Sequence, residues 1–172
     1  MSSKPARQPP ARVDKDHFRR TCARFPSGVT ILTMLDREGA PHGMTASSFT
    51  SVSLDPPLVL VCVDHRATVM EHLRGCEYFG INILSEEQHE LSTRFARRNE
   101  DRFDGVAWAP GHEGVPLIRG VLASFECDMH RVVDAGDHAI LIGEVLHAEH
   151  HEGRPLVYFG SGYHKLDGRH GE

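Results

Sequence analysis

The feature that most constrains the fold is a regular alternation in the second half of the chain. Val121, Ala123, Phe125, Cys127 and Met129 alternate with Leu122, Ser124, Glu126, Asp128 and His130. Successive side chains of a β-strand point to opposite faces, so this period of two predicts a strand with one apolar face and one largely polar face.

Similar β-type segments recur along the chain and are joined by short turns. The β-branched residues 29–34 predict a strand, Asp36–Gly39 a hairpin turn, and the stretch from Gly43 to Leu54 the return arm of that hairpin. Pro56 and Pro57 then interrupt the ladder. The unbroken apolar run at residues 58–63 is typical of a strand buried on both faces.

Further strands are predicted at residues 77–84, 139–145 and 155–159, with a turn over Asp134–Asp137. The predicted helices are fewer. The first lies at residues 16–25 and is ended by Pro26. The second follows a capping box formed by Thr68 and Glu71 and ends at Gly75. The third runs from a second capping box at Ser85–Gln88 to about Arg98. A long loop is predicted at residues 99–120, ordered in part by Phe103 and Trp108. Strands joined by hairpins with few helices predict a mainly β fold, a closed or nearly closed antiparallel barrel with peripheral helices.

Composition and charge narrow the class of protein. The chain has 172 residues, a size that suits one compact domain, which we place at residues 14–168 after a disordered tail at residues 1–13. A net charge of -5 with dispersed Lys and Arg gives no footprint for nucleic acid. Neither a membrane-length apolar run nor an apolar signal core is present, and the four cysteines are widely spaced. These features predict a cytoplasmic protein with no membrane partner and reduced thiols.

Several chemistries have no motif in this sequence. Neither a G-x-G-x-x-G fingerprint nor a P-loop is present, and no G-x-S-x-G elbow surrounds a serine. His89-Glu90 begins like a zinc-protease motif, but position 93 is Thr. His147, His150 and His151 cluster with Glu149 in a charged segment, where solvated side chains are the better interpretation. No metal site is predicted.

Hydroxyl side chains gather in the stretch from Gly43 to Phe49, which runs on to Pro57. Small polar side chains there can donate hydrogen bonds while the backbone approaches a flat or anionic ligand. A Ser/Thr-rich edge strand with its exit turn is the alternative interpretation.

Motifs in a fixed order add a resemblance. They are Phe25-Pro26-Ser27-Gly28-Val29, Gly43-Met44-Thr45-Ala46-Ser47-Ser48-Phe49, Ser53-Leu54-Asp55-Pro56-Pro57-Leu58, Phe79-Gly80-Ile81-Asn82-Ile83-Leu84, Gly136-Asp137-His138 and Tyr158-Phe159-Gly160. Over about residues 17–166 this set resembles the flavin reductase family, the small reductase components of two-component flavin-dependent monooxygenases.

The resemblance implies a split β-barrel, the flavin reductase-like FMN-binding fold, in a homodimer with flavin at the subunit interface. It implies an NAD(P)H-dependent flavin reductase, in which FMN or FAD takes a hydride from NADH or NADPH. The reduced flavin would then reach a separate monooxygenase by diffusion. At Asp64-His65-Arg66 the sequence departs from the hydroxyl-rich turn of relatives, which leaves open whether the site prefers FMN or FAD.

The resemblance also assigns residues to the flavin. Met44, Thr45 and Ala46 match the backbone that contacts the ring, and Ser47 and Ser48 match hydroxyls on the phosphate side, helped by Cys62, Val63, Asp64 and Thr68. Arg94 and Phe95 match a pair that closes over the flavin. Structural alternatives stay open for three of them: Thr68 as a helix cap, Phe95 as core and Arg94 as a solvated charge.

The Gly-Asp-His turn makes His138 the candidate catalytic residue, as a group that positions the dinucleotide or polarises the region near flavin N5. Phe159 and Gly160 match positions near the nicotinamide. A turn residue and a barrel-end plug are the structural alternatives for His138 and Phe159. Two other functions remain open: a tightly FMN-bound oxidase of the pyridoxamine-phosphate type, and a non-enzymatic flavin or haem carrier.

Overall fold

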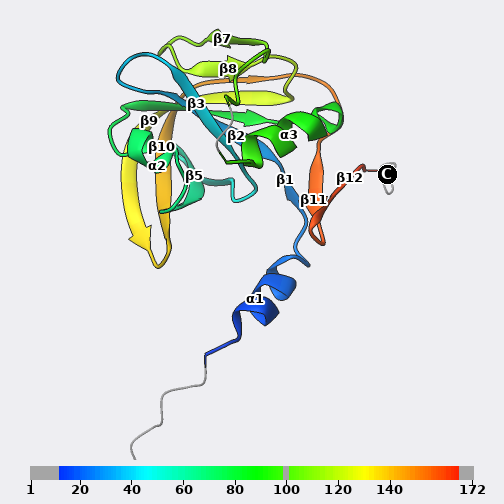
Figure 1. Ribbon diagram of the computed structural model, residues 1–172. Coiled ribbons are helices and arrows are strands. Elements are labelled where there is room, and N and C mark those ends of the chain that lie inside the picture. The colour runs from blue at the N-terminus through cyan, green and yellow to red at the C-terminus, as the bar shows by residue number, and fades with distance from the viewer. Residues whose placement is uncertain (1–11, 99–100, 167–172) are drawn as a thin grey trace, which may run out of the picture.

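The protein is built around one antiparallel sheet. The computed structural model describes residues 12–98 and 101–166. Its seven-stranded sheet has the order β3-β2-β6-β9-β10-β5-β4 (Figure 1). The strands are β2 (Thr30–Leu35), β3 (Pro41–Ala46), β4 (Thr50–Leu54), β5 (Pro57–Asp64), β6 (Tyr78–Ile83), β9 (Ala123–Ala135) and β10 (His138–His150). The predicted mainly β fold is confirmed.

Smaller elements surround this sheet. A three-stranded sheet joins β1 (Ser27–Gly28), β11 (Val157–Phe159) and β12 (Gly162–His164), and a two-stranded one joins β7 (Trp108–Pro110) and β8 (Pro116–Ile118). The helices are α1 (Lys15–Cys22), α2 (Met70–Leu73) and α3 (His89–Ala96), with a 3-10 turn η1 at Glu86–Gln88. None of the described helices is both long and apolar enough to cross a membrane.

The sheet curls but stays open. Strands β3 and β4 are its two edges, and in the described chain no ladder joins them. The loop between them carries Ser48, whose hydroxyl accepts a hydrogen bond from Cys62 N at 2.9 Å and donates one to Cys62 O at 3.1 Å. The end of β3 therefore lies beside β5, which agrees with the predicted split barrel. The prediction that one hairpin arm runs from Gly43 to Leu54 is wrong, because the chain crosses from one sheet edge to the other after Ala46.

The core is divided into two clusters by strand β2. Leu32 and Met34 pack with Val61, Phe79 and Leu141 on one side, and Ile31 packs with Leu84, Phe95 and Ile118 on the other. Strand β2 is thus buried on both faces, as is most of β6. Strand β5 alternates instead between buried valines and half-buried residues, so the prediction of two fully buried faces for residues 58–63 does not hold for the single chain.

The helix predictions need correction at two ends. Helix α1 ends at Cys22. Its own Phe18 is 57% exposed, and Phe25, which follows the helix, is 79% exposed. The helix projects from the body of the molecule (Figure 1). Before α2 the cap is Val69, without a side-chain hydrogen bond, so the predicted capping box at Thr68 is wrong. The capping box between Ser85 and Gln88 is confirmed, with Ser85 N donating to Gln88 Oε1 at 3.0 Å.

The predicted tail and the predicted end of the domain extend beyond the described residues. Most of the tail at residues 1–13, and residues 167–168 of the predicted domain, lie outside the described residues. The predicted loop at 99–120 contains the β7–β8 hairpin, and its remaining part is ordered by Phe103, which lies edge-on between Phe95 at 5.1 Å and Trp108 at 6.0 Å.

The polar face predicted for residues 121–130 is partly buried. Ser124 is 7% and Glu126 2% exposed. The Glu126 carboxylate accepts hydrogen bonds from the backbone N–H groups of His112 at 2.9 Å and Glu113 at 2.8 Å. A Cβ on Gly111 would lie 2.3 Å from Glu126 Cδ, so the hairpin turn closes around this carboxylate only because position 111 is glycine. Here the period of two predicted the strand correctly but could not show which face a later hairpin covers.

We expect Glu126→Gln to lower the free energy of unfolding by about 1–3 kcal/mol, because an amide N–H₂ would face one of the two backbone donors and leave it unpaired. Urea denaturation measures the change. The matched control is Glu149→Gln, at an exposed position of β10, with an expected effect within about 0.5 kcal/mol. Equal stabilities for the two variants would contradict this role of Glu126.

Candidate functional site

Some of the predicted flavin residues meet at a depression formed by β3, the end of β5, the segment before α2, and the end of α3. It has a volume of about 170 Å³. Its lining contains five of the predicted residues, Met44, Thr45, Asp64, Thr68 and Phe95. Ala67, Val69, Ala96, Arg98 and Arg102 complete it. The structure thus brings together side chains that are 51 residues apart in the sequence, from Met44 to Phe95.

Strand β3 is held against α3 by the side chain of Thr45. Its Oγ1 donates to the carbonyl of Ser92 at 2.6 Å, and the Ser92 hydroxyl in turn lies 2.8 Å from Tyr163 Oη. Ala46 is buried, and its carbonyl accepts a hydrogen bond from Thr30 Oγ1 at 2.9 Å. These bonds fix the edge strand, which would otherwise be paired on one side only, at the wall of the depression.

A glycine lets the aromatic wall approach that strand. A Cβ on Gly43 would lie 2.8 Å from Leu32 O and 2.9 Å from Phe95 Cε1. Phe95 is 1% exposed and belongs to the core, so its structural alternative is correct, while its ring also lines the depression. Arg94, the other member of the predicted pair, is half-buried on α3 and does not line the depression.

The remaining phosphate-side candidates differ in their environments. Ser47 and Thr68 are exposed, whereas Val63 is buried in the core and Cys62 is half-buried. Ser48 already donates its single hydroxyl proton to Cys62 O. Of the predicted hydroxyls, Ser47 and Thr68 are therefore the ones with the most access to a ligand.

The carboxylate of Asp64 is paired with the side chain and the backbone N–H of Arg66. Arg66 donates to it from Nη2 at 2.7 Å, from Nε at 3.1 Å and from its backbone N at 2.8 Å. The hydrogen bonds of the Arg66 side chain hold the pKa of Asp64 well below its usual range. The unusual Asp64-His65-Arg66 turn thus carries a carboxylate whose charge is offset by its own neighbour.

Two arginines of the depression were missed in the sequence. Arg102 donates to Gly43 O at 2.6 Å from Nη1 and to Arg97 O from Nε and Nη2, so it fastens the segment after α3 to β3. Arg98 lies on the same segment. A basic cluster at the end of α3 was the available signal, but nothing in the sequence indicated that this segment folds back over Gly43.

His138 lies opposite Asp64 in the pairing of β10 with β5. Its Nδ1 is 2.7 Å from Asp137 Oδ1, a hydrogen bond that lowers the pKa of Asp137. The turn before it is fastened to the turn after β5, because His65 N donates to Asp137 O at 3.0 Å. His138 is therefore a half-exposed imidazole with a carboxylate partner, held beside the strand that leads to the depression.

Phe159 and Gly160 lie elsewhere. They belong to the β11–β12 hairpin, where Gly160 N donates to Ala23 O at 3.0 Å and the Arg24 guanidinium lies 5.2 Å from the centre of the Phe159 ring. Figure 1 shows this hairpin and the β9–β10 turn on different sides of the molecule. A single chain does not bring the three predicted nicotinamide residues together.

A larger hollow, of about 910 Å³, lies between the β7–β8 hairpin and β10. Its lining includes Glu126 and His147 but none of the predicted flavin or nicotinamide residues. His147 stacks on His112 at 4.2 Å, and His150 and His151 are exposed. Of these two hollows, only the smaller depression is lined by residues predicted for the flavin.

Comparison with known proteins shows the family of the chain. The family model described as the flavin reductase like domain matches residues 22–167. The chain is 44% identical to the FMN reductase (NADH) SmoA of Agrobacterium fabrum, over 90% of the chain and 87% of SmoA. It is 49% identical to the reductase component of the flavin-dependent trigonelline monooxygenase of Acinetobacter baylyi, over 70% of the chain and 39% of that protein.

The fold is shared with solved structures of the same kind. The NADH:FAD oxidoreductase SgcE6 of Streptomyces globisporus, in complex with NAD and FAD fragments, superposes with a TM-score of 0.85 at 39% identity, over 90% of this chain and 93% of SgcE6. The chain covers 57% and 45% of two further curated relatives, so it spans about half of their length. The curled sheet, the ordered motifs and the match over residues 22–167 show that this chain belongs to the flavin reductase like family.

Proposed function

We propose that this protein is an NAD(P)H-dependent flavin reductase that supplies reduced FMN or FAD to a separate monooxygenase. The observation that carries this proposal is the depression that joins Met44, Thr45, Asp64, Thr68 and Phe95 in a chain of this family. Relatives named as an FMN reductase, an NADH:FAD oxidoreductase and a reductase component of a monooxygenase support the same activity.

The lining of the depression suits a flavin in both of its parts. A planar ring needs apolar walls, which Met44, Val69 and Phe95 offer. An anionic phosphate needs donors and positive charge, which Thr68, Arg98 and Arg102 offer at the same place. Bound flavin would supply the hydride-accepting chemistry, while the protein would orient the two planar ligands and limit access of water.

The other predicted residues would contact the flavin or the nicotinamide as follows. The backbone of Met44, Thr45 and Ala46 would face the ring. Ser47, Cys62, Val63, Asp64 and Thr68 would line the phosphate side, with Ser48 holding the loop there through Cys62. Arg94 and Phe95 would close the site from α3, and His138, Phe159 and Gly160 would contact the nicotinamide.

The active form that we propose is a homodimer, because one face of the sheet is left half-covered. Cys62 pairs with Ile140 and Leu60 with Ile142, and side chains paired in register point to the same face. All four are half-buried apolar side chains, whereas their neighbours Val61, Val63 and Leu141 on the other face are buried. A second copy that covers this face would make β5 buried on both sides, as its apolar sequence indicates.

The geometry of the site supports the same assembly. A volume of about 170 Å³ is below the roughly 300–1,000 Å³ of typical ligand pockets, so further walls are needed. His138 and Asp64 lie in register with the half-covered face. A partner chain there could bring its own Phe159 and Gly160 to the His138 of this chain, which explains why the predicted nicotinamide residues are apart in one chain.

A cytoplasmic location remains part of the proposal. All four cysteines are free thiols. Burial raises the pKa of Cys127 to about 12, so this thiol is unreactive at neutral pH. Free thiols without disulfides are usual in a reducing compartment.

The activity is tested with purified full-length protein, NADH or NADPH, and added FMN, FAD or riboflavin. We expect oxidation of the nicotinamide, followed at its near-ultraviolet absorbance band, to depend on added flavin. No flavin-dependent oxidation with any combination would overturn the proposal. A protein that purifies yellow and ignores NADH and NADPH would favour the pyridoxamine-phosphate type of oxidase, and flavin or haem binding without turnover would favour a carrier.

For His138 we expect His138→Ala to lower kcat/KM for the nicotinamide nucleotide by about 10-fold, or about 1.4 kcal/mol, with flavin affinity retained. His130→Ala, on the same hairpin at an exposed position, is the matched control and should keep the activity. Full turnover of His138→Ala at limiting NADH would remove the role assigned to His138.

For the dimer we expect Ile140→Glu to convert the protein to monomers, because a charge on the half-covered face cannot be desolvated against an apolar partner. Light scattering after size-exclusion chromatography measures the mass. Leu166→Glu, at an exposed position outside this face, should leave the dimer intact. A monomeric unsubstituted protein, or a dimer that Ile140→Glu leaves unchanged, would contradict the proposed interface.

A further inference from the structure

We propose that Asp36, His42 and His72 form a binding site for a divalent transition metal ion, with Zn²⁺ as the best-suited ion. The site lies outside the flavin depression, and sequence analysis predicted no metal site at all. Its ligands come from three elements: Asp36 follows β2, His42 lies in β3 and His72 in α2.

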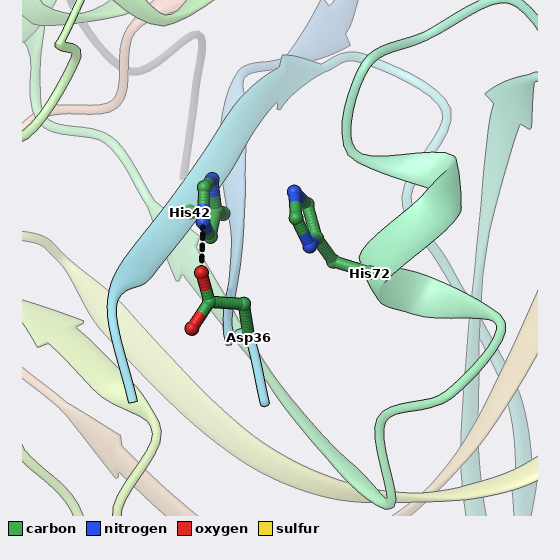
Figure 2. A group of neighbouring side chains, drawn as sticks. All are labelled: Asp36, His42 and His72. Atoms are coloured by element: carbon green, nitrogen blue, oxygen red, sulfur yellow. Dashed lines mark hydrogen bonds and ion pairs between the residues drawn. The ribbon is translucent and has the colours of Figure 1, made fainter. Parts of the chain in front are cut away.

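The three side chains converge on one point between the β2–β3 hairpin and α2. Their candidate ligand atoms all lie within 4.8 Å of one another. Figure 2 shows the two imidazole rings face to face, with the Asp36 carboxylate beside the ring of His42. All three side chains are partly buried, with side-chain exposures of 18% for Asp36, 33% for His42 and 23% for His72. They are therefore shielded in part from water and still accessible to an ion.

The carboxylate is already positioned as a ligand. Asp36 Oδ1 accepts hydrogen bonds from the backbone N–H of Glu38 at 2.9 Å and of Ala40 at 2.8 Å, which fixes the group in the hairpin turn. Oδ2 lies 2.9 Å from His42 Nε2. One oxygen is thus anchored and the other is directed at the imidazole.

The two imidazoles lie face to face beside the carboxylate. Their ring centres are 3.9 Å apart with an interplanar angle of 18°. Protonation of both rings would bring two like charges together, whereas two neutral rings can each offer a nitrogen lone pair. Zinc binds imidazole nitrogen at about 2.0–2.1 Å and carboxylate oxygen at about 2.0–2.2 Å, so the stacked rings would turn about their side-chain bonds until a nitrogen of each faces the ion.

The donor set decides the class of ion. Two nitrogens and one carboxylate oxygen suit Zn²⁺, and Ni²⁺ or Cu²⁺ on the same grounds, whereas Ca²⁺ and Mg²⁺ prefer oxygen ligands. Glu71 Oε1 lies 3.6 Å from His72 Nε2 and can hold the far side of that ring or replace a water in the fourth position. A ligand set of this kind binds Zn²⁺ with an open or water-filled position.

The site links the two walls of the flavin depression. Two residues after His42, strand β3 contributes Met44, and three residues before His72 lies Val69. An ion that bridges His42 and His72 would therefore restrain β3 relative to α2. This coupling rests on the proposed flavin site, whereas metal binding itself does not.

Metal binding is tested with the untagged full-length chain, freed of metal by a chelator and titrated with Zn²⁺ against a chromophoric chelator. We expect one equivalent to bind in preference to any further ions. At 100 times Kd, Zn²⁺ should raise Tm by about 5–10 °C. Mg²⁺ at the same concentration should leave Tm unchanged.

Substitution of the proposed ligands tests where the ion binds. His72→Ala and Asp36→Asn should each weaken Zn²⁺ binding by more than about 100-fold, because loss of a ligand exceeds the usual effect of losing a supporting contact. Asp36→Asn keeps an oxygen that can accept the bonds from Glu38 and Ala40, so the hairpin turn is retained. The matched control is His147→Ala, which removes one ring of the other stacked pair, with His112, and should keep the affinity.

Equal affinities in the unsubstituted chain and in both ligand variants would overturn the site, as would a loss confined to His147→Ala. Circular dichroism checks that each variant is folded. Flavin affinity, measured with and without Zn²⁺ by fluorescence, tests the coupling, for which we expect a change of about 5-fold or more. One-to-one Zn²⁺ binding with unchanged flavin affinity would support the metal site and overturn the coupling alone. The failure of flavin reduction in the earlier assay would leave the Zn²⁺ titration interpretable.

Discussion

The architecture depends on the contact by which the curled sheet returns to itself. Ser48 bonds both backbone groups of Cys62, so the loop after one edge strand is fixed to the strand beside the other edge. This contact adds to the hydrogen bond between Thr45 and Ser92 that holds β3 against α3, so the walls contributed by Met44 and Asp64 are kept together. The Ser48 hydroxyl is thus a structural group of this stretch, because its two hydrogen bonds connect the two ends of the curled sheet.

A second constraint concerns the apolar face that the single chain leaves half-covered. The homodimer that we propose would account for the half-covered face of β5 and β10, for the small volume of the depression and for the separation of His138 from the β11–β12 hairpin. Apolar area left in water on one face of a sheet is a driving force for association. In this scheme binding and assembly depend on each other, because the same face supplies the interface and carries His138.

The fold and half of the site could be predicted from local sequence. The period-two alternation and the turn residues predicted most strands, and Met44, Thr45, Asp64, Thr68 and Phe95 do meet in one depression. The errors share a cause. Glu126 was assigned to a polar face because a strand pattern cannot reveal a hairpin that later covers it. Thr68 was predicted as a cap because its spacing to Glu71 fits, although the helix begins after Val69. Each error concerns what a distant segment does to a local pattern.

The sequence by itself determined the strand order along the chain, the membership of the motifs and which residues are candidates to bind a flat, anionic ligand. Those properties depend on side-chain type and spacing, which the chain carries with it. The tertiary structure alone decided that Arg98 and Arg102 join the depression, that Phe159 is remote from His138, and that Asp36, His42 and His72 converge. These are contacts between segments far apart in sequence, and they follow from the curl of the sheet and the packing of α2 and α3, which no local spacing records.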